Sequence, residues 1–153
     1  MVLALFLSLA AAVPFVAQRK DTCGAASLAM VLAYWDVAVT QDAIAKELLL
    51  PELHGIAGSR LEAFARGKGL VAVAHAGDLA HLRHHVDKGR PLIVAWNMGR
   101  GRYHNVVVVG FDDDDAIVHD PARGASRRVR LRDFDRRWAG AGRWTLLVAP
   151  ASS

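Results

Sequence analysis

The chain runs Gln18-Arg19-Lys20-Asp21-Thr22-Cys23-Gly24-Ala25-Ala26-Ser27 ahead of an apolar segment that is dense in Ala, Leu and Met as far as Trp35. This composition predicts a helix over residues 25–35 with Cys23 at its first turn. Free backbone N–H groups and the helix dipole favour negative charge at that place, so a thiol there ionises more readily than a thiol in water. Cys23 is the only cysteine of the chain and cannot form an internal disulfide. The stretch therefore predicts a helix that presents a reactive thiol.

The composition predicts one folded domain. The chain has 153 residues, of which 53% are hydrophobic and 22% charged, as in a globular protein with its own core. Residues 1–17 carry no charge, and residues 2–12 resemble the apolar core of a secretory signal that ends in small residues. We therefore predict a signal or export segment over residues 1–12, whose true start can lie upstream, and a domain over residues 13–150. The expected location is exported, periplasmic or extracellular, and the apolar segment leaves membrane association open.

Hydrophobic periodicity divides the chain into a helical front half and a β-rich second half. Further helices are predicted after the capping residues Thr40 and Asp78, in a segment that ends at Gly67, and over residues 131–138. Ser59-Arg60-Leu61-Glu62 matches a capping box. Strand-like runs occupy residues 71–74, 92–96, 105–110, 116–118, 128–130 and 144–148. The order of these segments predicts an α+β fold, with the helical half packed against an antiparallel sheet.

A thiolate nucleophile needs a general base, and the base needs a third group that fixes its orientation. His104 begins a predicted strand directly after a Gly/Arg loop, and Asp120 ends the next predicted strand. The acidic turn at residues 112–115 lies roughly midway between them, so the two side chains are expected to meet across an antiparallel hairpin. Gln18 precedes Cys23 by five positions. Its amide, with the Cys23 N–H, is a candidate to bind the oxyanion of a tetrahedral intermediate.

The motifs follow one another as Gln-x4-Cys-Gly-x-Ala-x-Leu-Ala-Met, a Tyr-His strand that runs into Val-Val-Gly-Phe-Asp, then His-Asp-Pro, and a terminal Phe…Trp…Leu-Leu-Val-Ala-Pro. This series resembles the papain-like cysteine peptidases that remove double-glycine leaders from bacteriocin precursors, in particular the stand-alone relatives without transporter domains. The resemblance spans about residues 14–150. It implies a papain-like fold with Cys23 as nucleophile, His104 as base, Asp120 as orienting residue and Gln18 as oxyanion residue.

The resemblance implies a hydrolase that cuts peptide bonds of a peptide or protein substrate through a thioester, without a cofactor. One difference concerns the substrate, because many transporter-linked members have an acidic residue directly before the cysteine, where this chain has Thr22. Two alternatives stay open. With an amine in place of water, the same thioester would serve an acyltransferase or a peptide-crosslinking enzyme. A non-catalytic domain would instead hold an extended peptide in the cleft.

Other polar clusters are interpreted as structural. Arginines crowd residues 123–143 and contribute to a net charge of +4, but they alternate with apolar residues, so we expect solvated sides of a strand and a helix and no nucleic-acid binding. The histidines at 81, 84 and 85 lack the further ligands of a zinc motif, and a solvated helix face without metal is expected. The four aspartates at 112–115 lack calcium-loop spacing and are interpreted as a turn. Trp96 and Tyr103 flank the loop before His104 and are candidate linings of a substrate groove.

Overall fold

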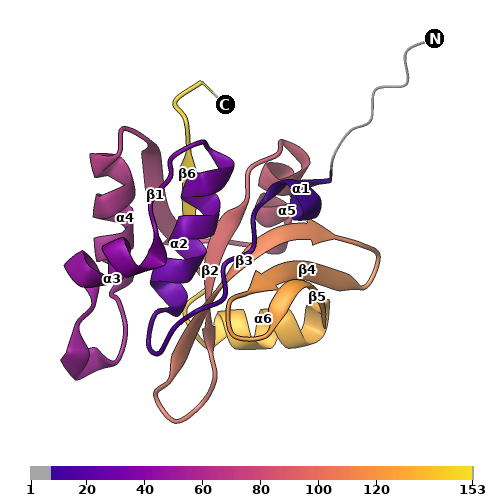
Figure 1. The fold of residues 1–153 in the computed structure, drawn as a ribbon. Coiled ribbons are helices and arrows are strands. Elements are labelled where there is room, and N and C mark those ends of the chain that lie inside the picture. Colours follow the sequence, from indigo (N-terminus) through magenta and orange to yellow (C-terminus); the bar gives the residue numbers. More distant parts are fainter. Residues whose placement is uncertain (1–7, 153) are drawn as a thin grey trace.

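The computed structural model describes residues 8–152, and Figure 1 shows the arrangement of their helices and strands. The helices are α1 (Leu9–Ala12), α2 (Cys23–Tyr34), α3 (Gln41–Leu48), the 3-10 helix η1 (Pro51–Leu53), α4 (Gly58–Gly67), α5 (Leu79–Asp87) and α6 (Leu131–Ala139). The strands are β1 (Val71–Ala76), β2 (Leu92–Asn97), β3 (Tyr103–Phe111), β4 (Asp115–Asp120), β5 (Gly124–Arg130) and β6 (Trp144–Ala149). The predicted α+β class is therefore confirmed.

Across the described residues, the strands form one antiparallel sheet of six strands in the order β1-β6-β2-β3-β4-β5. β2 and β3 pair as a hairpin in which Trp96 lies opposite His104. β4 pairs with the other side of β3, where Val107 lies opposite His119. The start of β3 and the end of β4 consequently lie at the same end of the sheet.

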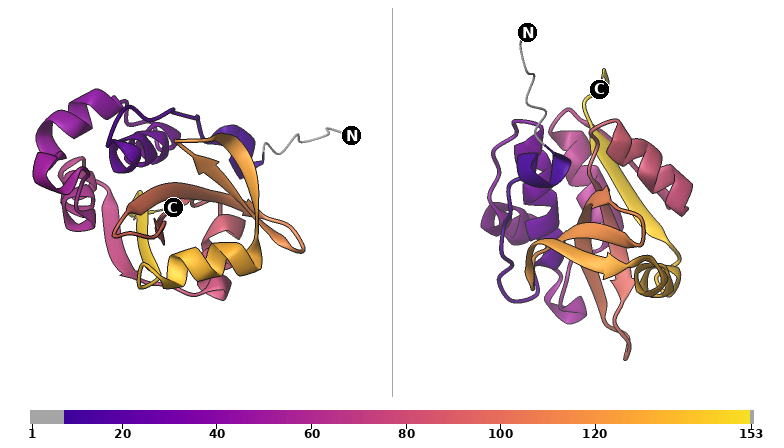
Figure 2. Two further views of the ribbon diagram at one scale, coloured as in Figure 1. Left: turned by 90° about the horizontal axis from the view of Figure 1, so that it is seen from below. Right: turned by 90° about the vertical axis from the view of Figure 1, so that its right-hand side faces the viewer.

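Helices cover both faces of the sheet, as Figures 1 and 2 show. α2, α3 and α4 pack on one face, and α5 and α6 pack on the other. Neighbouring strand residues alternate between the two cores: Ile93 and Val107 pack with α2, whereas Val94 and Val106 pack with α6. Because both faces are buried, β2 and β3 read as continuous apolar runs without polar alternation.

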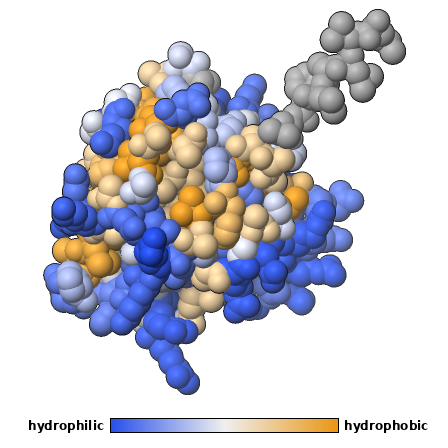
Figure 3. Space-filling view, viewed as in Figure 1, coloured by the Kyte–Doolittle hydropathy of each residue, from blue (hydrophilic) through white to orange (hydrophobic). Residues whose placement is uncertain are grey.

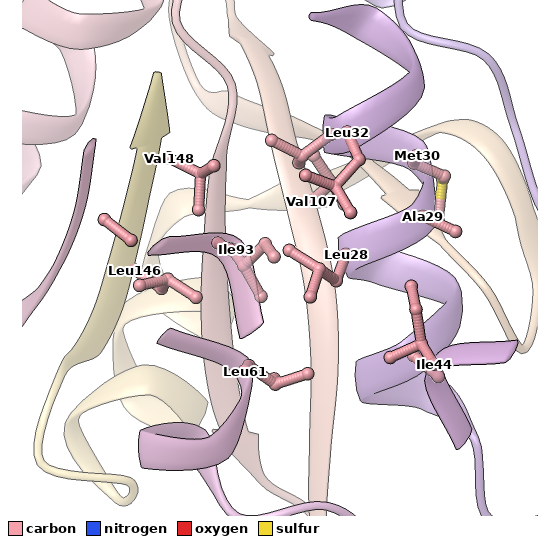
Figure 4. Close-up of a cluster of buried hydrophobic side chains, with 14 of the residues drawn as sticks. Leu28, Ala29, Met30, Leu32, Ile44, Leu61, Ile93, Val107, Leu146 and Val148 are labelled. Carbon is pink, nitrogen blue, oxygen red and sulfur yellow. The ribbon is translucent and has the colours of Figure 1, made fainter. Parts of the chain in front are cut away.

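α2 is the central helix of the larger core. Its residues 24–32 are all buried, which explains why the segment is apolar on every side. Figure 4 shows Leu28 and Leu32 of this helix beside Ile93 and Val107 of the sheet, with side chains of α3, α4 and β6 around them. Truncating a leucine in such a core costs about 2–5 kcal/mol. This packing fixes the position of the first turn of α2, where Cys23 lies.

The segment around Val13, which precedes the loop before Cys23, is anchored to β4. Val13 is buried, and Leu9 and Ala10 of α1 pack against the same core as α2. The buried His119 ring accepts the Ser126 N–H at Nδ1 over 3.0 Å, so its Nε2–H donates to the Val13 carbonyl over 2.9 Å. Burial lowers the pKa of His119, which keeps this neutral tautomer in place.

The predicted export segment covers residues 1–12, and residues 1–7 of it lie outside the described residues. The part that the structure describes is short: α1 spans Leu9–Ala12 and contacts β3 and β4. Among residues 8–152, no helix has the length and apolar character needed to cross a bilayer.

Two side chains of α4 cover the outer edge of β1. Glu62 Oε2 accepts the Ala74 N–H over 2.5 Å, and Arg66 Nε donates to the Ala72 carbonyl over 2.9 Å. Glu62 and Arg66 also form an ion pair with each other at 3.5 Å. The predicted capping box is wrong, because α4 begins at Gly58 without a side-chain cap and Glu62 reaches the strand instead.

The acidic turn and the arginines of the second half pair with one another. Asp112 Oδ1 accepts the Asp115 N–H over 3.0 Å, and the Asp112 carboxylate also forms an ion pair with Arg128. This arrangement matches the predicted hairpin turn between β3 and β4. Hydrophilic residues gather over the lower part of the face shown in Figure 3, around the tip of the β2–β3 hairpin and α6.

Candidate active site

Cys23 is the first residue of α2, so its side chain lies at the N-terminal end of a buried helix. The thiol is half-buried and lines an open groove of about 880 Å³. Thr22 is the N-cap residue, but its hydroxyl makes no capping bond to the helix and contacts Arg19 and Gln41. The first turn of α2 therefore has no side-chain cap for its free N–H groups.

His104 and Asp120 meet across the β3–β4 pair, at the end of the sheet next to Cys23. His104 Nε2 lies 2.7 Å from Asp120 Oδ1, and the Asp120 carboxylate also accepts the Ala122 N–H over 2.9 Å. Burial raises the pKa of Asp120, but the hydrogen bond and charge of His104 outweigh it, so the net pKa is lowered. Asp120 is therefore held as a carboxylate beside the imidazole.

The imidazole of His104 is placed between this carboxylate and the thiol. Asp120 occupies Nε2, so Nδ1 is the ring nitrogen that remains for Cys23. Burial lowers the pKa of His104, but hydrogen bonding to Asp120 and Cys23 and the negative charge of both raise it to about 9. A histidine with this pKa is protonated at neutral pH. The arrangement suits an imidazolium that stabilises a thiolate and later donates its proton.

Gln18 lines the same groove as Cys23. Its backbone N–H donates to the Pro121 carbonyl over 2.8 Å, which ties its loop to the segment after Asp120. Its side-chain Oε1 is buried and has no hydrogen-bond partner among residues 8–152. The amide nitrogen is consequently the end of the side chain that the groove can reach. The structure thus brings all four predicted site residues to one groove.

Asn105 is a residue of the groove that the sequence reasoning missed. Its Oδ1 lies 3.8 Å from Cys23 Sγ, and its amide nitrogen donates to the Val94 carbonyl over 3.4 Å. With its nitrogen toward the Val94 carbonyl, the amide has its oxygen toward the thiol. A Cβ on Gly24 would lie 3.2 Å from the same oxygen, so glycine after the nucleophile leaves room for Asn105. In the sequence, the only indication that Asn105 lies in the groove was its position directly after His104.

The groove has walls of different chemistry. Trp96 and Tyr103 line it, in agreement with their place around the loop before His104. Arg137 lies with its guanidinium carbon 5.2 Å from the centre of the Trp96 ring, a cation–π arrangement. A second cavity of about 490 Å³ adjoins the groove through Tyr103 and Asn105. The two cavities share Ile56, Tyr103 and Asn105 as lining residues, so they form one continuous surface beside the thiol.

Two of the three histidines of α5, His81 and His85, do not lie on the solvated face that was expected. His81 Nδ1 lies 3.0 Å from His75 Nε2 of β1, and His81 Nε2 lies 3.1 Å from His85 Nε2. Burial, together with the charges of His81 and Arg90, lowers the pKa of His85 to about 4. The expectation of a solvated face is wrong for His81 and His85, because His81 contacts His75 of β1 and His85 is buried. It holds for His84, which is exposed. The two ring nitrogens of His81 contact different partners, His75 and His85. The rings of His75, His81 and His85 therefore follow one another in a row and do not converge on one point.

Comparisons with known proteins identify the family and the fold of the chain. The sequence profile of the family described as "Peptidase_C39 like family" matches residues 10–145. A search of curated proteins finds no match. Among solved structures, the chain is similar to a double glycine motif protease from an AMS/PCAT transporter, solved in complex with the leader peptide. Their TM-score is 0.70 at 30% identity, covering 90% of this chain and 91% of that one.

Two further structures share the fold at lower identity. The peptidase domain of Streptococcus ComA, a bi-functional ABC transporter of a quorum sensing pathway, has a TM-score of 0.78 at 22% identity, with 90% of this chain and 98% of that chain covered. The N-terminal peptidase C39 like domain of a toxin secretion ATP-binding protein from Vibrio parahaemolyticus has a TM-score of 0.66 at 20% identity, with 88% and 99% covered. These likenesses confirm the papain-like fold predicted from the motifs.

The expected location outside the cell is corrected by these comparisons. The similar domains belong to an ABC transporter, in the case of ComA, and to a toxin secretion ATP-binding protein, in the case of the Vibrio protein. The family profile also begins at residue 10, inside the segment that was interpreted as a signal. Residues of that segment pack into the core, as Leu9 and Ala10 do. The prediction of an exported, periplasmic or extracellular protein is therefore wrong.

Proposed function

The chain belongs to the Peptidase_C39 like family, and on that premise we propose that it is a cysteine peptidase in which Cys23, His104, Asp120 and Gln18 carry the reaction. The single observation that carries the proposal is the placement of His104, with Asp120 on one ring nitrogen and the thiol of Cys23 left for the other. A buried structural thiol needs no such base. A nucleophile does.

The reaction begins from a thiolate–imidazolium pair, in which His104 already holds the proton of the Cys23 thiol. The thiolate attacks the carbonyl carbon of the substrate, and the carbonyl oxygen becomes an oxyanion. The Gln18 amide and the Cys23 N–H donate hydrogen bonds to this oxygen. His104 then gives its proton to the leaving amine, and a thioester on Cys23 remains.

Water completes the turnover. His104, now neutral, takes a proton from a water molecule that attacks the thioester. The second tetrahedral intermediate collapses, the carboxylate product leaves, and the proton returns to the thiol. Asp120 holds the imidazole in one orientation and stabilises its charged form through both steps.

We propose a peptide leader as the class of substrate. The open groove admits an extended chain, and a relative of 30% identity is described as a double glycine motif protease in complex with a leader peptide. Thr22 occupies the position at which many transporter-linked members have an acidic residue. The sequence that this protein cleaves is therefore to be determined by experiment and is not transferred from those members.

A digest of a proteome-derived peptide library tests the proposal. Wild-type protein is expected to generate new peptide ends, which mass spectrometry identifies together with the residues on both sides of each cut. Cys23→Ala and His104→Ala are the matched controls, and both should generate none. The masses also separate the alternatives, because hydrolysis adds water whereas acyl transfer joins the acyl part to an amine. Binding of peptides without any new ends in wild type would identify a non-catalytic domain and refute the proposal.

A further inference from the structure

The side chain of Gln41, at the start of α3, forms hydrogen bonds with the loop that carries Gln18. Gln41 Nε2 donates to the Ala17 carbonyl over 2.6 Å. Gln41 Oε1 accepts the Arg19 N–H over 3.1 Å and the Thr22 hydroxyl over 2.9 Å. These bonds engage the residue before Gln18, the residue after it, and the residue before Cys23. One side-chain amide therefore contacts the loop on both sides of Gln18 and directly before Cys23.

The loop has a conformation that needs such support. Asp21 has a φ of 61°, in the left-handed region that residues with a side chain adopt less readily than glycine. Thr22 closes the loop on itself, since its hydroxyl oxygen accepts the Arg19 N–H over 2.9 Å and lies 2.8 Å from the Arg19 carbonyl. The single Thr22 hydroxyl proton serves either that carbonyl or Gln41. The Gln41 amide is thus part of one hydrogen-bonded unit with both ends of the turn.

We propose that Gln41 is a positioning residue for the oxyanion site, and this inference rests on the proposed function. By fixing Ala17 and Arg19, it holds Gln18 between them at one place in the groove. By engaging Thr22, it holds the same place relative to Cys23. Gln41 itself acts only through these residues and touches no reacting atom.

The physical basis is preorganisation. Oxyanion donors accelerate a reaction because they are already in place when the charge develops, and loss of one donor costs about 10²–10³ in kcat. The bonds from Gln41 to Ala17 and Arg19 are exposed to solvent, so water can replace them at little cost in stability. Water cannot keep the loop in one position. Removing Gln41 should therefore impair oxyanion binding far more than folding.

The test compares Gln41→Ala and Gln41→Glu with a matched control, Asp42→Ala. Asp42 is the next residue of α3 and pairs with Arg19 Nε at 2.9 Å between side chains that are 61% and 71% exposed. Asp42 contacts only the side chain of Arg19 in this loop and none of its backbone groups, and such surface ion pairs contribute little to stability. Glu at position 41 can still accept from Arg19 and Thr22 but cannot donate to Ala17. It should give an intermediate effect.

Three measurements separate positioning from structure. Alkylation of Cys23 by iodoacetamide forms no oxyanion, so its rate should stay within about twofold in all variants. Peptide hydrolysis forms one, and in Gln41→Ala the kcat should fall at least tenfold while KM changes less than about threefold. The Tm should change by no more than a few degrees. Asp42→Ala should match wild type in every measurement.

A peptide nitrile, N-acetylglycyl-aminoacetonitrile, gives a readout that does not depend on turnover. The Cys23 sulfur bonds to the nitrile carbon, one π bond of the C≡N group opens, and His104 passes the thiol proton to the nitrogen, which then occupies the oxyanion position of the resulting thioimidate. Its affinity should weaken at least tenfold in Gln41→Ala and remain unchanged in Asp42→Ala.

The outcomes distinguish this inference from the proposed function. Nitrile binding by wild type without peptide cleavage would refute the peptidase proposal, and the effect of Gln41→Ala on the nitrile would still decide the inference. Unchanged kcat and nitrile affinity in Gln41→Ala would overturn the positioning role. Equal losses of alkylation, nitrile binding and Tm would also overturn it, because they would indicate a role in folding alone.

Discussion

Asp120 Oδ1 lies 2.7 Å from His104 Nε2, and the two side chains are only 6% and 13% exposed. Burial on its own lowers the pKa of His104, yet this contact and the neighbouring thiol raise it to about 9. The ring is therefore charged at neutral pH although it is largely removed from water. The contact is also the link between β4 and the site, and its consequences for rate and for stability can be measured separately.

Asp120→Asn should slow peptide hydrolysis about 10²–10⁴-fold, the range that general acid–base catalysis contributes. The His104 proton is lost as the pH rises through about 9, so wild-type kcat/KM should decline above that pH. Without the carboxylate charge the pKa of His104 falls, and the alkaline decline should begin at lower pH. Profiles of kcat/KM against pH for wild type and for Asp120→Asn measure the alkaline decline of each protein. An alkaline limb at the same pH in both proteins would contradict the assignment.

Asp120→Asn should also lower stability in a defined pH range. The raised pKa of His104 stabilises the fold fully below 6.5, and this contribution is lost as the pH rises through about 9. The lowered pKa of Asp120 contributes above 3.8 and is lost as the pH falls through its folded value. The deficit of the variant should therefore be largest between about pH 4 and 6.5, near 3 kcal/mol for a broken buried pair. Denaturant unfolding at several pH values measures it, and a deficit independent of pH would argue against the pair.

His104→Ala should shift the alkylation of Cys23 toward higher pH. In wild type the imidazolium favours the thiolate, so iodoacetamide should react well below pH ~8, where a model thiol begins to ionise. The rate of Cys23 modification, followed by mass spectrometry across pH, gives the profile for each protein. Cys23→Ala controls for other sites of reaction. Identical profiles with and without His104 would refute the thiolate–imidazolium pair.

Gly24→Ala should impair both stability and reactivity. A Cβ there would lie 3.2 Å from Asn105 Oδ1 and 3.3 Å from Leu61 Cδ1, and overpacking of this kind costs about 1–3 kcal/mol. Because Asn105 must move, its 3.8 Å contact with the thiol should be lost as well. Gly67→Ala in α4 is the matched control, since a Cβ there meets nothing within 4 Å. It should be neutral or stabilising, and equal effects of the two changes on Tm would contradict the packing argument.

A chain that starts at residue 14 should be less stable than one that starts at residue 8. The shorter chain lacks Val13, whose carbonyl accepts the proton of the buried His119. A buried donor without a partner costs about 1–3 kcal/mol, and the packing of Leu9 is lost in addition. Thermal unfolding of the two chains measures the difference. Equal Tm values would show that the segment before Pro14 contributes nothing to the fold.

The local features of the site were within reach of the sequence, because they depend on short distances along the chain. A strand that begins with His104 and a turn midway to Asp120 bring the two ends of a hairpin together, whatever else the protein does. The helix at Cys23 follows from an apolar segment in the same way. The functional roles of these residues stay predictions until the experiments above are done.

The features that sequence reasoning missed all join segments that are distant along the chain. Gln41 reaches a loop that ends 19 residues earlier, and Asn105 faces a thiol 82 residues away. Glu62 fits a capping box locally, but the approach of β1 offers it an N–H that the local pattern cannot reveal. His81 was expected in solvent for the same reason. Long-range packing decides between partners that look equivalent along the sequence.

The side chains of Glu62 and Arg66 occupy the hydrogen-bonding groups of the outermost strand β1. At the opposite edge, β5 carries exposed arginines that discourage another strand from pairing there. A peptide that arrives as a substrate therefore finds neither edge open for strand addition. The groove that the Cys23 thiol lines lies instead at the end of the sheet. By occupying the edge of β1, Glu62 and Arg66 therefore also leave this groove as the surface on which an extended peptide can bind.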